Sequence, residues 1–263
     1  MTNSPDAKRP DLGSVFTHAG VAAAYKHRPP YPTEVFDTLQ ELIVDEPRAV
    51  LDIGAGEGAI ARPLATRVDR IDAVDVSAAM IAAGRQRPGG QAANIRWIHS
   101  DVESATLDGP YALVTAGASL HWMRWPDTMN RLVPLLSPNA KLAIVDHGPR
   151  DLPWQDELLA IIKRHSRNPD YDPSFSIVDF LVGQGLLDDI DKAEFGPTPF
   201  WQPVADYVEQ FHSTATLARE HMSPREVREF DEAVEAAVSP WITDGRVKLP
   251  IVAKVVWGRP QAG

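Results

Sequence analysis

Gly54, Gly56 and Gly58 alternate in a short segment that directly follows a run of strand-forming residues, 48–53. Glycine adopts positive φ angles and has no Cβ atom, so a ligand can approach the main chain closely at these positions. A helix that begins after such a loop presents free N–H groups and the positive end of its dipole. The spacing therefore predicts a binding site for a ligand with a nucleotide-like or carboxylate-bearing part.

This loop is compatible with two cofactors. Ala59 completes the pattern G-x-G-x-x-A of dinucleotide-binding proteins, and Asp75 follows about 20 residues further on, where an acidic residue that binds ribose is expected. NAD and S-adenosylmethionine (SAM) both fit these features. A tight turn without a ligand is the remaining interpretation, although a plain turn seldom needs three glycines in five residues.

The composition limits the function classes. The chain has 263 residues, a formal net charge of −10 and no cysteine. The acidic balance disfavours nucleic acid and anionic membranes as partners, and the lack of cysteine excludes disulfides, thiolate nucleophiles and Cys-ligated zinc. No His, Asp or Glu spacing is typical of a metal site, and the sequence contains no apolar leader or membrane-spanning run. We therefore expect a soluble cytoplasmic protein.

Strands and helices alternate through the first half of the sequence. This alternation predicts an α/β fold, a Rossmann-like doubly wound sheet that is mostly parallel, with helices on both faces. Thr33 and Ser77 are expected to cap their helices, and Pro63 either bends the helix after the glycine loop or delays its start. Strands are expected at 48–53, 71–75, 95–98, 111–115 and 141–145, and helices at 16–25, 33–44, 77–85 and 126–136.

The pattern changes after His147. Ser223 and Glu226 form a capping box at the start of the last helix. Helices inserted between the late strands predict a cap over the carboxyl edge of the sheet, where ligands bind in such folds. Helices are expected at 155–164, 177–184, 203–214 and 223–238, and strands at 192–200 and 247–257. We expect one domain, 16–263, after a loosely attached tail, 1–15, with N-terminal helices in 16–46 and cap segments at about 148–190 and 203–240.

Four segments carry patterns that are shared with a known family. They are Leu51–Gly58 with the glycine loop, Ala73–Ser77 with its acidic residue, Ser100–Val102, and Ala116–Trp122, which a helix and Leu135–Leu142 follow. Arg28–Pro32 adds an N-terminal pattern. Together these residues resemble the class I SAM-dependent methyltransferases of the small-molecule type, the group of trans-aconitate methyltransferases and methyltransferase type 11. The resemblance covers residues 20–147 well and 190–257 in outline.

The resemblance implies a seven-stranded sheet with an antiparallel last strand, SAM as the cofactor and S-adenosylhomocysteine as the product. Asp75 would accept hydrogen bonds from both ribose hydroxyls, because a carboxylate offers two oxygens. Asp101 would bind the adenine amino group or, alternatively, only cap a turn. Asp52 would orient the methionine part or only cap the loop. The cofactor-binding residues expected on this basis are Gly54, Ala55, Gly56, Asp75, Val76, Met80, Asp101, Val102, Ala116, Arg28 and Tyr25.

Methyl transfer is an in-line displacement, so the protein mainly positions its reactants and excludes water. A hydroxyl or carbon acceptor benefits from a general base, and histidine is the usual base near neutral pH. His121 follows strand four and is therefore the candidate base or substrate contact. His147, at the end of strand five, is the next candidate. The expected substrate contacts are Tyr31, Trp122, His147, Tyr171 and Trp201.

Two other functions remain compatible with the sequence. An NAD-dependent oxidoreductase would use the same loop but would leave Asp101 and the segment around His121 without a simple role. A non-catalytic accessory protein with the SAM fold would not need the intact loop and its acidic residues. The main prediction is SAM-dependent methyl transfer to an O, N or C atom of a small molecule.

Overall fold

The computed structural model describes Phe16, residues 18–167 and residues 175–263. The expected tail, 1–15, and Tyr171 lie outside the described residues. The chain separates into two compact units, which we call the sheet unit and the helical unit. The described part of the sheet unit comprises 29–153, 175–201 and 248–263, and that of the helical unit comprises Phe16, 18–28, 154–167 and 202–247.

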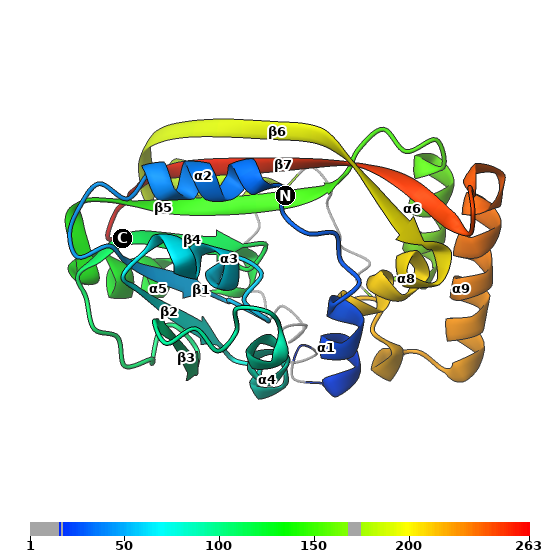
Figure 1. Ribbon diagram of the computed structural model, residues 1–263, viewed down its shortest axis with the longest axis horizontal. Coiled ribbons are helices and arrows are strands. Elements are labelled where there is room, and N and C mark those ends of the chain that lie inside the picture. Colours follow the sequence, from blue (N-terminus) through cyan, green and yellow to red (C-terminus); the bar gives the residue numbers. More distant parts are fainter. Residues whose placement is uncertain (1–15, 17, 168–174) are drawn as a thin grey trace. The chain divides into compact units, whose positions relative to one another are not determined.

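A seven-stranded sheet runs through the structure in the order β3-β2-β1-β4-β5-β7-β6 (Figure 1). Strands β1 to β5 pair in parallel, whereas β7 runs antiparallel to β5. This arrangement confirms the predicted α/β sheet with an antiparallel last strand. The strands are β1 Ala49–Ile53, β2 Arg70–Asp75, β3 Ile95–His99, β4 Tyr111–Gly117, β5 Leu136–Pro149, β6 Leu187–Pro203 and β7 Arg246–Pro260.

The register brings the ends of the central strands to one edge. Ile53 at the end of β1 lies opposite Val74 of β2, and Gly117 at the end of β4 lies opposite Val145 of β5. Parallel strands end at the same edge of a sheet, and ligands bind beyond that edge in open α/β folds. The glycine loop, Asp75 and the segment after β4 therefore share the carboxyl edge, as the sequence predicts.

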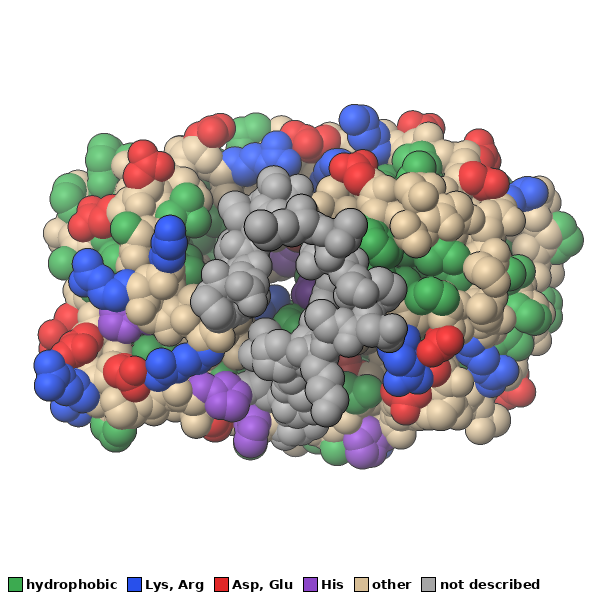
Figure 2. All heavy atoms as spheres, turned by 180° about the vertical axis from the view of Figure 1, so that it is seen from behind, with side chains coloured by type: hydrophobic (Ala, Val, Ile, Leu, Met, Phe, Trp, Pro, Cys, Tyr) green, Lys and Arg blue, Asp and Glu red, His purple; other side chains and the backbone are tan. Residues whose placement is uncertain are grey.

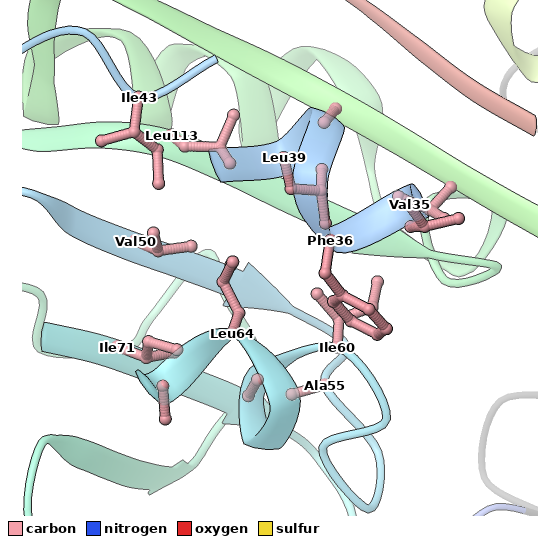
Figure 3. Packing of buried hydrophobic residues seen from close by; sticks show 14 of the residues in the cluster. Val35, Phe36, Leu39, Ile43, Val50, Ala55, Ile60, Leu64, Ile71 and Leu113 are labelled. Atoms are coloured by element: carbon pink, nitrogen blue, oxygen red, sulfur yellow. The ribbon is translucent and has the colours of Figure 1, made fainter. Parts of the chain in front are cut away.

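Hydrophobic clusters cover both faces of the sheet, because alternate residues of a buried strand point to opposite faces. Val50 of β1 faces helices α2, Thr33–Glu41, and α3, Ala61–Leu64 (Figure 3). Leu51 faces the other cluster, to which α5 and α7 contribute. The remaining helices of the sheet unit are α4 Ala78–Gln86, α5 Trp125–Leu132 and α7 Ile177–Gly183.

One predicted helix start differs from the structure, and the late start predicted as one of two alternatives for the helix after the glycine loop is confirmed. Thr33 is the first residue of α2 rather than its N-cap, which is Pro32 without a side-chain hydrogen bond. The helix after the glycine loop begins late, at Ala61, and is only one turn long. Pro63 then lies in the first turn, where a main-chain N–H has no partner within the helix, so the proline costs no hydrogen bond. Ser77 does cap α4, because its Oγ accepts a hydrogen bond from Met80 N at 3.1 Å.

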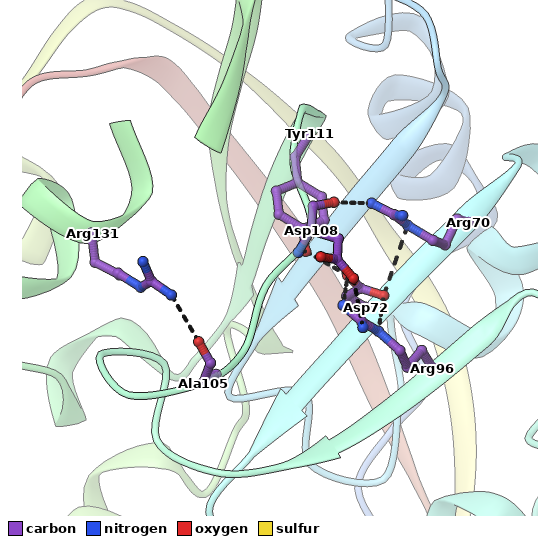
Figure 4. A network of polar contacts seen from close by, with 7 residues as sticks. All are labelled: Arg70, Asp72, Arg96, Ala105, Asp108, Tyr111 and Arg131. Carbon is purple, nitrogen blue, oxygen red and sulfur yellow. Dashed lines mark hydrogen bonds and ion pairs between the residues drawn. The ribbon is translucent and has the colours of Figure 1, made fainter. Parts of the chain in front are cut away.

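A buried ion network lies on β2, three residues before the carboxyl edge (Figure 4). Asp72 is 0% exposed, and Arg96 forms two hydrogen bonds with its carboxylate, at 2.9 and 2.7 Å. The Tyr111 hydroxyl also donates to Asp72, and burial together with this carboxylate raises the pKa of Tyr111. The network joins β2, β3 and β4 away from the glycine loop.

The helical unit has its own buried core. The Trp154 indole N–H donates to the Tyr207 hydroxyl at 2.8 Å, and Phe230 is fully buried. The predicted capping box of the last helix is present, with Ser223 and Glu226 in reciprocal hydrogen bonds. The helices of this unit are α1 Ala19–Tyr25, α6 Gln155–His165, α8 Val204–Glu209 and α9 Pro224–Val238.

The described surface contains both signs of charge. Acidic and basic side chains are interspersed over the described part of the face in Figure 2, without a continuous basic area. The described part of this face therefore does not provide the positive field that attracts a phosphate backbone. No helix in the described residues is long and apolar enough to cross a membrane.

Candidate active site

The loop after β1 leaves the sheet through three residues with positive φ, +64° at Gly54, +57° at Gly56 and +73° at Gly58. A Cβ atom on Gly54 would lie 2.4 Å from the Cβ of Ser119, and one on Gly58 would lie 2.5 Å from Cη2 of Trp97. Conformation and close packing therefore both require glycine at these two positions.

Asp75 connects this loop to the helix that follows β2. It is 8% exposed; its Oδ2 accepts the Gly56 N–H at 2.7 Å, and its Oδ1 accepts the Ser77 N–H at 2.7 Å. Burial raises the pKa of Asp75, and the two main-chain hydrogen bonds oppose that shift. Each carboxylate oxygen keeps a second lone pair, so Asp75 can still accept hydrogen bonds from ligand hydroxyls.

Asp52 lies on β1 directly before this loop and is 1% exposed. Its Oδ1 accepts a hydrogen bond from Thr115 Oγ1 at 2.8 Å, whereas its Oδ2 is buried without a hydrogen-bond partner in the described residues. Burial raises the pKa of Asp52 to about 7; the Thr115 hydroxyl and the Ala61 main-chain N–H oppose the shift, and the charge of Asp75 adds to it. A buried acceptor without a partner is costly, and a ligand with donor groups at the loop would satisfy it directly or through water. The residues present therefore fit a cofactor with an ammonium group.

Asp101 follows β3 and organises a turn. Its two oxygens accept hydrogen bonds from the Ser104 main chain, at 2.8 Å, and the Ser104 hydroxyl, at 2.7 Å, which together lower its pKa. These contacts are those of a turn cap, one of the two predicted roles of Asp101. The exposed carboxylate can still accept a hydrogen bond from an adenine amino group, the other predicted role. Val102 and Met80 are buried, and Val76 is exposed.

The segment after β4 is fastened to the end of β1. Ala116 is buried within β4, and the Ser119 hydroxyl donates to the carbonyl oxygen of Ile53 at 2.6 Å. A short 3₁₀ helix, Leu120–Trp122, then carries His121, which is partly exposed. The ring of His121 lies 4.6 Å from that of Trp122, centroid to centroid.

Tyr31 and His147 lie together at the same edge. Their ring centroids are 3.9 Å apart, and a Cβ atom on Gly117 would lie 2.9 Å from the Tyr31 hydroxyl oxygen. His147 Nε2 lies 2.7 Å from the carbonyl oxygen of Pro29. A carbonyl oxygen only accepts, so Nε2 carries a hydrogen atom in this contact. Strand β5 continues to Pro149, so His147 lies within the strand rather than at its end.

The other predicted residues have different surroundings. Tyr25 and Arg28 belong to the helical unit, where Arg28 lies over the Tyr25 ring at 4.1 Å and donates from Nε to Ser213 Oγ at 2.8 Å. Trp201 is exposed on β6. Tyr171 lies outside the described residues. Within the described residues, no group of three or more His, Asp or Glu side chains is arranged to hold a metal ion.

Sequence reasoning missed three residues that hold this edge together. Thr115 supports Asp52, Ser119 fastens the segment after β4, and Glu57 is a buried carboxylate within the glycine loop. Two of them carried a signal in the sequence, because Thr115 interrupts the otherwise apolar run 112–116 and Glu57 is a charge among glycines. Ser119 had none, since its partner is a main-chain carbonyl 66 residues away.

Comparisons with known proteins agree with this geometry. Residues 50–139 match the family model of the methyltransferase domain. An uncharacterized methyltransferase of Mycobacterium tuberculosis is 35% identical over 100 residues, which are 37% of this chain and 50% of that protein. A trans-aconitate 2-methyltransferase of Mycobacterium sp. is 30% identical over 161 residues, 60% of this chain and 59% of that protein. The match thus spans roughly half the length of these curated relatives.

Solved structures share the fold. A putative type II methyltransferase from Anaeromyxobacter dehalogenans has a TM-score of 0.57 at 22% identity, covering 89% of this chain and 99% of its own. A SAM-dependent methyltransferase from Geobacter sulfurreducens, in complex with S-adenosylhomocysteine, has a TM-score of 0.52 at 17% identity. The alignment covers 96% of this chain and 99% of that structure's chain. Residues 50–139 therefore match a methyltransferase domain, and the sheet order and the glycine loop agree with that match.

Proposed function

We propose that this chain binds SAM at the glycine loop and transfers its methyl group to an O, N or C atom of a small molecule. The observation that carries the proposal is the Asp75 carboxylate, which joins Gly56 of the loop to Ser77 at the carboxyl edge and keeps lone pairs for a ligand. The partnerless Asp52 Oδ2 on the neighbouring strand supports it.

SAM supplies an electrophilic methyl group on a sulfonium, so the residues of this chain need only bind, orient and exclude water. The main chain from Gly54 to Gly56 would receive the methionine part, and the Ala116 carbonyl would accept from its ammonium group. Asp75 would accept from both ribose hydroxyls. The adenine ring would contact Asp101, Val102, Val76 and Met80. Arg28 remains a candidate for the cofactor carboxylate, and Tyr25 or Tyr31 a candidate to cover the methyl group.

His121 is the candidate base for a hydroxyl or carbon acceptor, because it follows β4 beside the loop. A nitrogen acceptor would need no base. Tyr31, Trp122, His147, Tyr171 and Trp201 remain candidate substrate contacts. A small molecule is supported by the net charge of −10, which disfavours nucleic acid, and by the named substrate of the trans-aconitate relative.

The sheet also separates SAM from NAD. Dinucleotide-binding sheets are parallel in the order 3-2-1-4-5-6, whereas here the antiparallel β7 lies between β5 and β6. Titration calorimetry with S-adenosylhomocysteine, SAM and NAD tests the proposal. We expect binding of the first two and no heat with NAD; tight NAD binding without a SAM signal would overturn it.

Catalysis requires a second measurement. Incubation of the protein with methyl-labelled SAM and a fractionated metabolite extract should transfer label into the small-molecule fraction. Retained SAM binding without label transfer to any fraction would favour the non-catalytic accessory function instead.

A further inference from the structure

Glu57 is a buried carboxylate within the proposed cofactor-binding loop, and its side chain pairs with arginines that the proposed function does not use. It is 7% exposed and lies between Gly56, which donates to Asp75, and Gly58. Its Oε2 accepts two hydrogen bonds from Arg87, from Nε at 3.0 Å and from Nη2 at 2.7 Å. A paired guanidinium–carboxylate contact of this kind fixes orientation as well as distance.

Arg62 supplies a second guanidinium that contacts Glu57. Arg62 donates from Nε to the Glu57 carbonyl oxygen at 2.8 Å and from Nη1 to the Pro88 carbonyl oxygen at 3.1 Å. Its Nη2 lies 3.5 Å from Glu57 Oε1. Arg62 thus joins the loop to the segment that follows α4.

Trp97 and Gly84 bring α4 close to the loop between these contacts. A Cβ atom on Gly84 would lie 2.7 Å from the Glu57 carbonyl oxygen and 2.6 Å from Cη2 of Trp97. The Trp97 indole N–H donates to the Gly90 carbonyl oxygen at 2.9 Å. The ring therefore fills the space between the loop, α4 and the turn after α4.

These contacts attach the loop to both ends of one helix. At the start of α4, Asp75 accepts from both Gly56 and Ser77. At its end, Arg87 is the C-cap residue of α4 and holds the loop through Glu57. The positions of the Gly54–Gly58 amides are thus fixed by α4 from two sides.

We propose that Glu57 and Arg87 are positioning residues that hold the glycine loop in its ligand-binding shape. The pair would touch no part of the cofactor and would act through the loop amides. Removing Arg87 leaves the buried Glu57 carboxylate with only the longer contact to Arg62, at 3.5 Å, so the loop loses its second attachment to α4. This inference rests on the proposed function only in that SAM is the ligand of the loop.

The test compares Arg87→Gln and Arg87→Lys with the wild-type full chain. Arg225→Gln is the matched control, because it removes an Arg–Glu pair that is exposed on α9. Titration with S-adenosylhomocysteine gives affinity, and hydrogen exchange of the ligand-free protein reports the 54–58 amides. We expect Arg87→Gln to weaken binding about tenfold, the equivalent of about 1.4 kcal/mol, and to speed loop exchange. Arg87→Lys keeps the charge but loses the paired geometry, so we expect about threefold weaker binding.

The outcomes separate this inference from the proposed function. Unchanged loop exchange and unchanged affinity in Arg87→Gln, with only a lower unfolding temperature, would overturn the positioning role and leave SAM binding intact. A wild-type chain that binds no S-adenosylhomocysteine would overturn the proposed function, while faster loop exchange in Arg87→Gln would still support the attachment of the loop. If Arg87→Gln does not fold, the same readouts on Arg87→Lys decide.

Discussion

Asp72 and Asp75 lie three residues apart on β2 and are both buried, yet their partners differ in kind. Asp72 faces the guanidinium of Arg96 and the hydroxyl of Tyr111. Asp75 faces main-chain N–H groups, and no Lys or Arg side chain forms an ion pair with it in the described residues. One carboxylate is neutralised within the sheet, and the other is held at its edge by groups that carry no net charge.

This difference separates a structural carboxylate from a binding one. A charge that is matched by a guanidinium has little left to offer a ligand, whereas a carboxylate held by amides keeps its charge and part of its lone pairs. Burial raises the pKa of Asp75, because no cation offsets the cost of removing its charge from water. Asp72, in contrast, has the guanidinium of Arg96 beside it. Perturbed acids of this kind gather at functional sites.

The largest expected effect comes from breaking the structural pair. Asp72→Asn leaves Arg96 without its buried charge partner and with only the exposed Asp108, and we expect the free energy of unfolding to fall by about 3 kcal/mol in urea denaturation. Affinity for S-adenosylhomocysteine should change less than about twofold. Asp108→Asn is the control, since it removes the exposed partner of the same Arg96, and should cost less than about 1 kcal/mol. Equal losses in both variants would contradict the structural role of Asp72.

Asp75→Ala should have the opposite profile. Two charge-assisted hydrogen bonds to ribose would be lost, so calorimetry should show affinity for S-adenosylhomocysteine weakened about 100-fold. The free energy of unfolding should change less than in Asp72→Asn, because no cation is left unpaired. Unchanged affinity would remove Asp75 from the binding site.

The pH dependence sharpens the contrast through Asp52. Burial raises the pKa of Asp52 from an ordinary acidic value to about 7. Between about pH 4 and pH 7, the folded chain therefore keeps a proton on Asp52 that the unfolded chain has already released. This contribution to stability is complete below the unfolded pKa and is lost as the pH rises through about 7, at no more than about 1.4 kcal/mol per pH unit. Urea denaturation at several pH values should show this slope in the wild type and a shallower one in Asp52→Asn. Parallel curves would contradict the assignment.

The smallest effect is expected at an exposed carboxylate. Glu226 accepts hydrogen bonds from Ser223 N and from Arg167, which lower its pKa to about 2. Solvent screens such a pair, so Glu226→Gln should shift the urea midpoint least of these variants. Affinity for S-adenosylhomocysteine serves as the control and should stay at its wild-type value. If Glu226→Gln shifted the urea midpoint as much as Asp72→Asn does, burial would not determine the order of these stability effects.

Periodicity predicted the sheet well because buried strands and capped helices are local patterns. All seven strands were located, although β5 and β6 extend further than the predicted ranges, 141–145 and 192–200. The additional residues at the end of β5, 146–149, pair with β7, which the sequence alone does not reveal. Ser77 and the Ser223 capping box were correct since a cap involves residues three apart. Thr33 was wrong because Pro32 already starts the turn.

The sequence by itself determined the cofactor loop, its glycines and the acidic residue at the end of β2, because each requirement acts over a few residues. Only the tertiary structure decided which acids are paired, since Asp72 and Arg96 meet across strands 24 residues apart in the chain. The same holds for Glu57 and Arg87, which the close approach of α4 at Gly84 brings together. Long-range packing, and not local pattern, therefore selects which carboxylate is left to bind a ligand.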